Sequence, residues 1–468
     1  MGKISAFYTM PHPPIVIPEI GRGEEKKIQR TTDAFNKVAE DIARIEPDTI
    51  IIVTPHGPLF NDAIAMSFEN KIKGNLGRFS APQVNLSLEI DIPLTRKIIE
   101  YSAKEDIITV VMTRDSAKTY DIEYELDHGS MVPLYFINKK HTKYKLVHIT
   151  YGMLPKMQLY KFGMCIKKAV EDSDKNAVFI ASGDLSHMLT DDGPYGYSPY
   201  GEKFDNEIIS LLKDGDVLGI FNMDRTTIEK AGECGLRSYY VMLGAMNGYD
   251  IKGNLLSYEG TFGVGYSIMS FSLKETNLDT YTILLDQNRK RFKDKIHTTD
   301  PYIRLARESL THYLMYGEYM NLTSYVTEEM KNHKRGVFVS LKNDGQLRGC
   351  VGTIFPTTKN IAQEIIRNAV EAGLHDPRFI PVTEDELEEL DFSVDVLTEP
   401  EMATKEELDP KKYGVIVRSR GKSGLLLPDL EGVDTVEEQL SIALQKGRIF
   451  PYEDYTIEKF EVIRHNQV

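Results

Sequence analysis

The sequence predicts an α/β domain with a central mixed sheet flanked by helices, followed by a smaller α+β domain. Three observations lead to this fold class. The chain has 468 residues, which exceeds the size of one ordinary domain. Strand-like and helix-like segments alternate over residues 1–275, the pattern of a sheet covered by helices. Beyond them the composition changes and a second series of segments begins.

The first domain is expected at residues 1–275. The β-branched run at 49–53 (TIIIV) is typical of a strand that is buried on both faces. Residues 24–45 carry apolar or small residues at helical spacing. The other expected strands are 4–10, 107–112, 144–150 and 177–181, with a pair of strands within 257–273. The other expected helices are 131–138, 157–170 and 202–212.

Residues 276–291 are expected to be a linker, and residues 292–468 the second domain. The basic cluster at 289–295 (RKRFKDK) is typical of a solvated helix face or connector. A new helix should start at Pro301, with Thr299–Asp300 as its cap. The expected strands are 337–341, 347–354, 392–397 and 414–419, and the expected helices are 361–372 and 437–446.

Composition excludes several classes of function. The formal net charge of −14 argues against a nucleic acid as the main partner, because phosphate binding needs a basic face. Three cysteines far apart in the chain exclude a disulfide scaffold and fit a reducing cytoplasm. We expect no signal peptide and no membrane span, since the apolar runs are short. A small-molecule substrate is therefore expected, and a homo-oligomer stays compatible with these observations.

Four histidines lie in settings that core packing does not favour. His12 (MPHPP), His56 (TPHG) and His187 (SGDLSH) each follow an expected strand, and His128 (DHGS) stands at an expected helix start. Ligands gather beyond the carboxyl ends of strands in open α/β sheets. A single histidine there is more often a hydrogen-bonded turn residue. Three together favour a shared site.

These segments, together with Glu233 in GECG, resemble the signature of the LigB (class III extradiol dioxygenase) superfamily over roughly residues 1–273. The resemblance implies that His12, His56 and Glu233 bind iron(II), and that His187 and His128 lie beside the substrate. Two imidazoles and one carboxylate cover one face of an octahedral iron and leave the other face open. The implied substrate is a catechol-like or aminophenol-like ring, which dioxygen cleaves.

Other chemistry stays open at this point. Zinc or manganese would suit the same ligands, and a hydrolase or lyase is the alternative reaction class. The imidazole of His187 has a pKa range that suits proton transfer to and from a substrate hydroxyl. The related Memo branch has a cysteine in place of the glutamate, and Cys234 follows Glu233 here. If both residues begin a helix, their side chains diverge by about 100 degrees, so we expect Glu233 to face the metal and Cys234 to pack.

The second domain contains LRGCVGTI at 347–354, DPRF at 376–379 and SGLLLP at 423–428. Over roughly residues 292–466 these segments resemble the AMMECR-type domain. Arg348, Cys350 and Asp376 are candidates for a small-molecule cleft in which a cation activates the thiol. The alternative is that Cys350 is a core residue and Arg348 a structural ion-pair partner.

A LigB-like domain fused to an AMMECR-type domain resembles the fused proteins of the AmmeMemoRadiSam system. That resemblance implies a radical-SAM protein as a partner. A metal-binding module that serves such a partner is therefore a third functional alternative.

Overall fold

The structure is a computed structural model that describes residues 1–276, 278–287, 290, 300–343, 345–383, 386–387, 389–430 and 432–466. The chain divides into two compact units, Met1–Leu285 and Asp286–Val468, each with its own hydrophobic core. Most of the expected linker, and the basic cluster at 289–295 apart from residue 290, lie outside the described residues. The domain boundary therefore stays a prediction.

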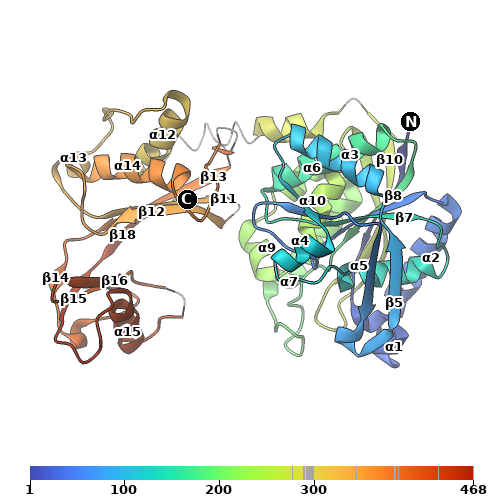
Figure 1. Ribbon diagram of the computed structural model, residues 1–468, viewed down its shortest axis with the longest axis horizontal. Coiled ribbons are helices and arrows are strands. Elements are labelled where there is room, and N and C mark those ends of the chain that lie inside the picture. Colours follow the sequence, from blue (N-terminus) through green and yellow to red (C-terminus); the bar gives the residue numbers. More distant parts are fainter. Residues whose placement is uncertain are drawn as a thin grey trace. The chain divides into compact units, whose positions relative to one another are not determined.

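Unit 1 is built on an eight-stranded mixed sheet in the order β6-β3-β7-β2-β8-β1-β10-β9 (Figure 1). The strands are β1 (Lys3–Met10), β2 (Thr49–Thr54), β3 (Ile64–Ser67), β6 (Thr109–Met112), β7 (Lys145–Thr150), β8 (Asn176–Ser182), β9 (Tyr249–Glu259) and β10 (Tyr266–Glu275). Strands β7, β2, β8 and β1 are parallel, and their register sets Met10 beside Ser182 and Thr54 beside Thr150. Their carboxyl ends therefore form one edge of the sheet.

Helices cover both faces of this sheet, so β2 is buried along its whole length (Figure 1). One face packs against α2 (Gln29–Ile45), α5 (His128–Asn138) and the hairpin of β4 (Lys71–Leu76) and β5 (Ala81–Glu89). The other face packs against α3 (Ile92–Lys104), α6 (Lys156–Glu171) and α10 (Leu236–Ala245). The remaining elements are η1 (Pro14–Val16), α1 (Pro18–Gly21), η2 (Glu24–Ile28), η3 (Gly77–Phe79), α4 (Arg114–Thr119), α7 (Pro199–Asp214), α8 (Val217–Phe221) and α9 (Arg225–Ala231).

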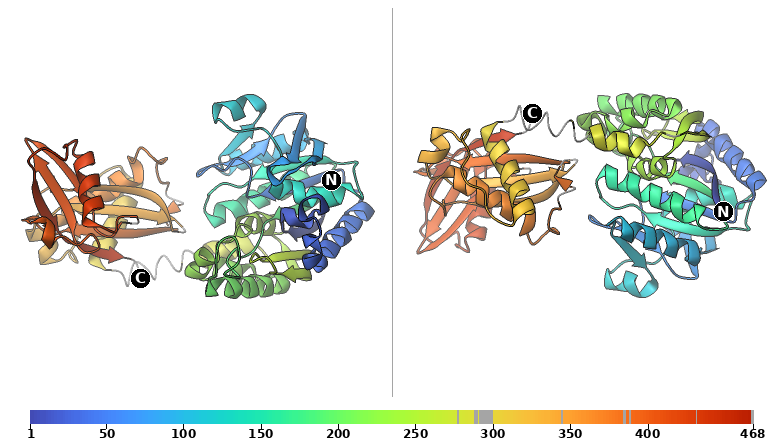
Figure 2. Two further views of the ribbon diagram at one scale, coloured as in Figure 1. Left: turned by 90° about the horizontal axis from the view of Figure 1, so that it is seen from below. Right: turned by 90° about the horizontal axis from the view of Figure 1, so that it is seen from above.

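Unit 2 has two four-stranded antiparallel sheets, in the orders β12-β11-β13-β18 and β14-β17-β15-β16 (Figure 2). Helices α12 (Pro301–Tyr316), α13 (Glu328–Asn332) and α14 (Ile361–Leu374) pack on the first sheet, and α15 (Val436–Lys446) packs on the second. The strands are β11 (Val337–Asn343), β12 (Gln346–Thr353), β13 (Leu390–Leu397), β14 (Glu401–Met402), β15 (Gly414–Ser419), β16 (Lys422–Leu426), β17 (Thr456–Phe460) and β18 (Val462–Asn466), with a short η5 (Lys405–Glu407).

The expected fold class is confirmed: a mixed sheet flanked by helices precedes a smaller domain with antiparallel sheets. Two boundaries are wrong by several residues. The strand pair expected within 257–273 begins at Tyr249, with β9, and ends at Glu275, with β10. The helix expected from residue 24 begins at Gln29, because Gly23 has a φ of 107° and residues 24–28 form a tighter 3-10 turn. In the described part of the chain, no helix combines the length and the apolar character that crossing a membrane requires.

Candidate metal centre

The candidate site lies at the sheet edge formed by the carboxyl ends of β1, β2 and β8. His12 and His56 each stand two residues beyond the end of their strand, and His128 is the first residue of α5. Prolines before and after His12 and before His56 restrict the backbone at both positions. Neighbouring parallel strands thus deliver side chains that are far apart in the sequence to one place.

His12 is buried and its tautomer is fixed by its neighbours. The Ser182 hydroxyl donates to the carbonyl oxygen of Gly129, so it accepts from the Nδ1–H of His12, 3.0 Å away. The Nε2 atom of His12 therefore carries the lone pair of the ring, and it lies 2.9 Å from Nε2 of His56. Two ring nitrogens that approach this closely are suited to share a cation or a proton.

Among the described residues, His12, His56 and His128 form a group whose possible ligand atoms all lie within 4.8 Å of one another. The rings of His56 and His128 are stacked, with centroids 4.2 Å apart. Burial and the neighbouring His56 hold the pKa of His12 well below its ordinary value. Burial and His128 lower the pKa of His56 to about 4. All three imidazoles should therefore be neutral near pH 7, the form that binds metal.

The pair Glu233–Cys234 lies in the turn before α10, not inside the helix. The carboxylate of Glu233 accepts a hydrogen bond from the backbone N–H of Leu236, the first residue of α10, at 2.6 Å. The thiol of Cys234 lies 3.6 Å from Nε2 of His12 and accepts from the backbone N–H of Asp184. The expected ligand set thus has two members in the histidine group, and Cys234 points toward the histidines where packing was expected. The ligand role of Glu233 stays a prediction.

His187 lies beside this group, and one of its two ring nitrogens forms a hydrogen bond with the backbone. Its Nδ1 donates to the carbonyl oxygen of Gly232, which leaves the lone pair of Nε2 free to accept a proton. The ring of Tyr195 packs edge-on against it at 5.2 Å, and Tyr195 is exposed. The ring of Phe79 packs against His128, with the ring centroids 5.3 Å apart. Both non-ligand histidines of the expected set are therefore flanked by an aromatic ring.

Two of the three second-domain candidates, Arg348 and Asp376, belong to separate ion pairs. Both Arg348 Nε and Nη2 donate to the carboxylate of Glu386, at 2.8 and 3.0 Å, and Nη1 donates to a backbone carbonyl. Asp376 accepts from the guanidinium of Arg378 and from the backbone N–H of Cys350. The Cys350 thiol itself accepts from the Ser340 hydroxyl at 3.2 Å. The cleft of Arg348, Cys350 and Asp376 thus stays a prediction, and the guanidinium of Arg378 donates to the carbonyl oxygen of Cys350 at 3.1 Å.

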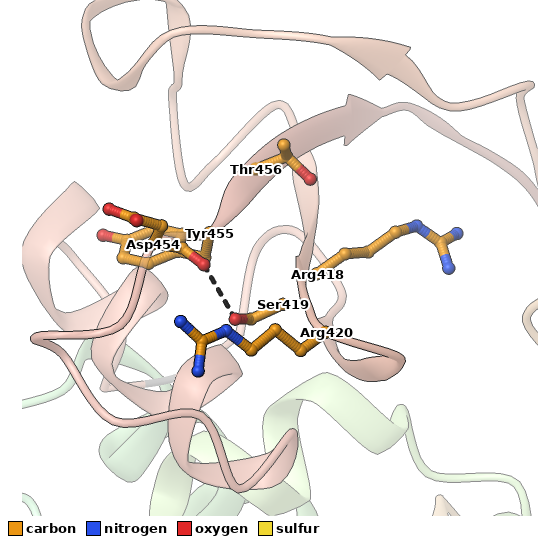
Figure 3. A pocket seen from close by; sticks show the side chains of 6 residues that line it. All are labelled: Arg418, Ser419, Arg420, Asp454, Tyr455 and Thr456. Carbon is orange, nitrogen blue, oxygen red and sulfur yellow. Dashed lines mark hydrogen bonds between the residues drawn. The ribbon is translucent and has the colours of Figure 1, made fainter.

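A pocket of about 370 Å³ lies elsewhere in unit 2, along the ends of β15 and β17 (Figure 3). The Ser419 hydroxyl, which lines this pocket, donates to the carbonyl oxygen of Asp454 at 2.7 Å (Figure 3). The guanidinium of Arg418 is held by Glu458 at 2.9 Å. None of the residues that line this pocket belongs to the cleft expected from the sequence.

Sequence reasoning missed four polar groups around the histidines: Ser182, Asp184, Asp127 and His148. Ser182, Asp184 and Asp127 lie inside or beside the quoted motifs, so the motifs themselves were the available signal. His148 had none, because within the run KLVHIT of β7 it looks like one polar residue in a buried strand. Burial raises the pKa of Asp184 to about 6, against an opposing effect of His187.

The fold and this group of histidines define a class: an α/β protein with a histidine-rich candidate metal site at a sheet edge. Residues 6–269 match the family described as the catalytic LigB subunit of aromatic ring-opening dioxygenase, and the chain belongs to that family. LigB enzymes are metal-dependent. Residues 303–465 match the AMMECR1 family, so LigB and AMMECR1 domains occur in a single chain.

Relatives share this organisation to different extents. Protein CA_C1420 of Clostridium acetobutylicum is 58% identical over 466 residues, which is 99% of this chain and 100% of the relative. A Thermotoga maritima protein is 47% identical over 34% of this chain and 97% of its own length. Among solved structures, protein PH0010 of Pyrococcus horikoshii (31% identity, TM-score 0.32) covers 35% of this chain and 88% of its own. Protein JW3007 of Escherichia coli K12 (13% identity, TM-score 0.39) covers 57% and 98%.

Proposed function

We propose that this chain is an iron(II)-dependent, extradiol dioxygenase-like enzyme that cleaves a catechol-like or aminophenol-like ring with dioxygen. The observation that carries the proposal is the pair of Nε2 atoms of His12 and His56, 2.9 Å apart, with the lone pair of His12 fixed toward the site. His12 and His56 would hold the metal, with Glu233 as the third ligand. Bound iron would supply a Lewis acid for the two substrate oxygens and electrons for dioxygen.

The residues around the metal position have separate tasks. His187 can take a proton from a substrate hydroxyl at Nε2, since its Nδ1–H is held by Gly232. The rings of Tyr195 and Phe79, beside His187 and His128, offer apolar surfaces to a planar substrate. These features support an aromatic substrate.

A second candidate is a zinc-dependent hydrolase or lyase, which the position of Cys234 favours. The Cys234 thiol lies 3.6 Å from Nε2 of His12, a member of the histidine group, and a thiolate with imidazoles suits zinc. Burial and the nearby Asp184 raise the pKa of this thiol well above its ordinary value. A bound cation would reverse that effect, because thiolate ligation releases the proton.

The test is anaerobic purification with metal analysis, followed by oxygen uptake against a panel of small catechols. Glu233→Gln and Cys234→Ser are the matched pair of variants, since each keeps the size of its side chain. Iron lost in Glu233→Gln alone, together with oxygen uptake in the wild type, supports the dioxygenase. Zinc lost in Cys234→Ser alone, without oxygen uptake, favours the second candidate. Full metal content in His12→Ala would refute the site itself.

A further inference from the structure

A buried carboxylate–histidine pair lies beside the histidine group, and neither residue has a task in the proposed chemistry. Asp127 caps the start of α5, and its side chain is 7% exposed. His148 lies in β7, and its side chain is 3% exposed. Nε2 of His148 lies 3.1 Å from Oδ2 of Asp127, and Nδ1 of His148 pairs with the Ser67 hydroxyl at 2.8 Å.

Every partner of the Asp127 carboxylate is a donor. Oδ1 accepts from the Thr54 hydroxyl at 2.6 Å and from the backbone N–H of Ser130 at 3.1 Å. Oδ2 accepts from the Ser130 hydroxyl and from His148, each at 3.1 Å. Such a set of donors satisfies the ionised form of a carboxylate, so Asp127 places a fixed negative charge there.

Three short connections lead from Asp127 to the three imidazoles. Thr54, which donates to Asp127, accepts from the backbone N–H of His56 at 3.3 Å. His128 is the next residue in the chain, at the helix start that Asp127 caps. The carbonyl oxygen of Gly129 accepts from Ser182, the residue that fixes the tautomer of His12.

Gly129 is packed tightly against the residues that make these connections. A Cβ at this position would lie 2.4 Å from Thr54 Oγ1, 2.8 Å from Asp127 Oδ1 and 3.4 Å from His56 Cδ2. A displacement of Asp127 would therefore move the segments that carry His56 and His128.

We propose that Asp127, held by His148, is the positioning residue of the metal site: it aligns the three imidazoles and balances the charge of the cation. This inference rests on the proposed function, since it requires a metal at His12 and His56. Outer partners of metal ligands typically change metal affinity by about 10- to 100-fold when they are removed. Asp127 acts through Thr54, Ser130 and the start of α5 and does not itself touch the metal.

The chain provides a matched control at the opposite end of the same strand. Asp91 caps α3, is buried, and accepts from the hydroxyl of Thr49 at 2.6 Å and from the backbone N–H of Leu94. Thr49 begins β2 and Thr54 ends it. Asp91 and Thr49 thus match Asp127 and Thr54 in the helix cap and in the threonine hydrogen bond. They differ in having no contact with His148 and in lying at the end of β2 away from the candidate metal site.

The experiment measures Co²⁺ affinity and the visible Co²⁺ absorption of the full chain. Asp127→Asn should weaken binding about 10-fold or more and shift the absorption bands, while Asp91→Asn stays within about twofold of wild type. Thr54→Val against Thr49→Val repeats the comparison with smaller changes, in case Asp127→Asn fails to fold. Wild-type affinity in both Asp127→Asn and Thr54→Val, or equal losses in both matched pairs, would overturn the inference alone. A wild-type chain that binds no Co²⁺, or His12→Ala that binds it equally well, would overturn the proposed function and the inference with it.

Discussion

Two glycines hold the turn that carries Glu233 and Cys234 against the loop after β8. A Cβ built on Gly183 would lie 2.0 Å from the Cα of Gly235. Ordinary van der Waals contact begins at 3.4 Å, so Gly183→Ala forces backbone apart by about 1.4 Å. The hydrogen bond from the backbone N–H of Cys234 to the carbonyl oxygen of Asp184, 3.3 Å long, spans the same contact.

This displacement of about 1.4 Å is large compared with the variation in distance that a metal–ligand bond allows. Metal–ligand distances hold to within about 0.2 Å, and a structural zinc site gains about 10–16 kcal/mol from four ligands, or roughly 3 kcal/mol for each. Loss of the third ligand should therefore weaken metal binding by about 100-fold. The strain itself should lower the unfolding free energy by about 1–3 kcal/mol.

The assay combines Co²⁺ titration with thermal unfolding of Gly183→Ala and of a control, Gly248→Ala. Gly248 has a φ of 90°, and its Cβ would meet only the flexible end of Lys167 at 3.6 Å. The control should lose about 1–2 kcal/mol of stability through backbone strain and keep its metal affinity. Wild-type metal affinity in Gly183→Ala would refute the reasoning, because neither Glu233 nor Cys234 could then be a ligand in this turn.

The remaining predictions test pH dependence, modularity and the second domain. Burial raises the pKa of Asp205 to about 7, so between pH 4 and 7 the folded chain binds this proton more tightly and stability falls as the pH rises. Asp205→Asn should remove a slope of up to about 1.4 kcal/mol per pH unit in urea titrations, and an unchanged slope would contradict the shift. Fragments 1–285 and 286–468 should each unfold cooperatively, since each unit has its own core; failure of both would contradict this. Cys350 should alkylate slowly in the native chain, and Arg348→Ala should not change that rate, because Arg348 is held by Glu386. Rapid labelling that Arg348→Ala abolishes would make Arg348 the activating cation.

Segments with a helical period or a continuous β-branched run could be predicted from the sequence, and a buried helix without a polar face could not. The run TIIIV is β2, and the helix expected at 157–170 is α6. Helix α10 was not expected, because LRSYYVMLGA is buried on nearly every side and shows no polar face. The alternation in β5, where Val84 and Leu88 are buried between exposed residues, was a signal that could have revealed the β4–β5 hairpin.

Part of the candidate site could likewise be predicted from the sequence, and part could not. The histidine positions could be predicted because strand ends meet at one edge of a parallel sheet. The orientation of the pair Glu233–Cys234 could not, since the helical spacing applied to them begins only at Leu236. In a turn, neighbouring side chains do not follow the helical angle of about 100 degrees. The position of Cys234 beside His12 therefore had to come from the structure.

The choice of metal depends on this one turn. The hydrogen bond that Glu233 accepts from Leu236 is worth about 1–3 kcal/mol, no more than the roughly 3 kcal/mol of a metal ligand, so it does not exclude Glu233 from the metal. Cys234 needs no rearrangement to approach His12, but it must lose a proton that burial makes hard to remove. A hard cation such as iron(II) or manganese favours release of the carboxylate, and a softer cation such as zinc favours the thiolate. Under the two proposed functions, the cation that the turn favours therefore decides between oxygen-using and non-oxidative chemistry.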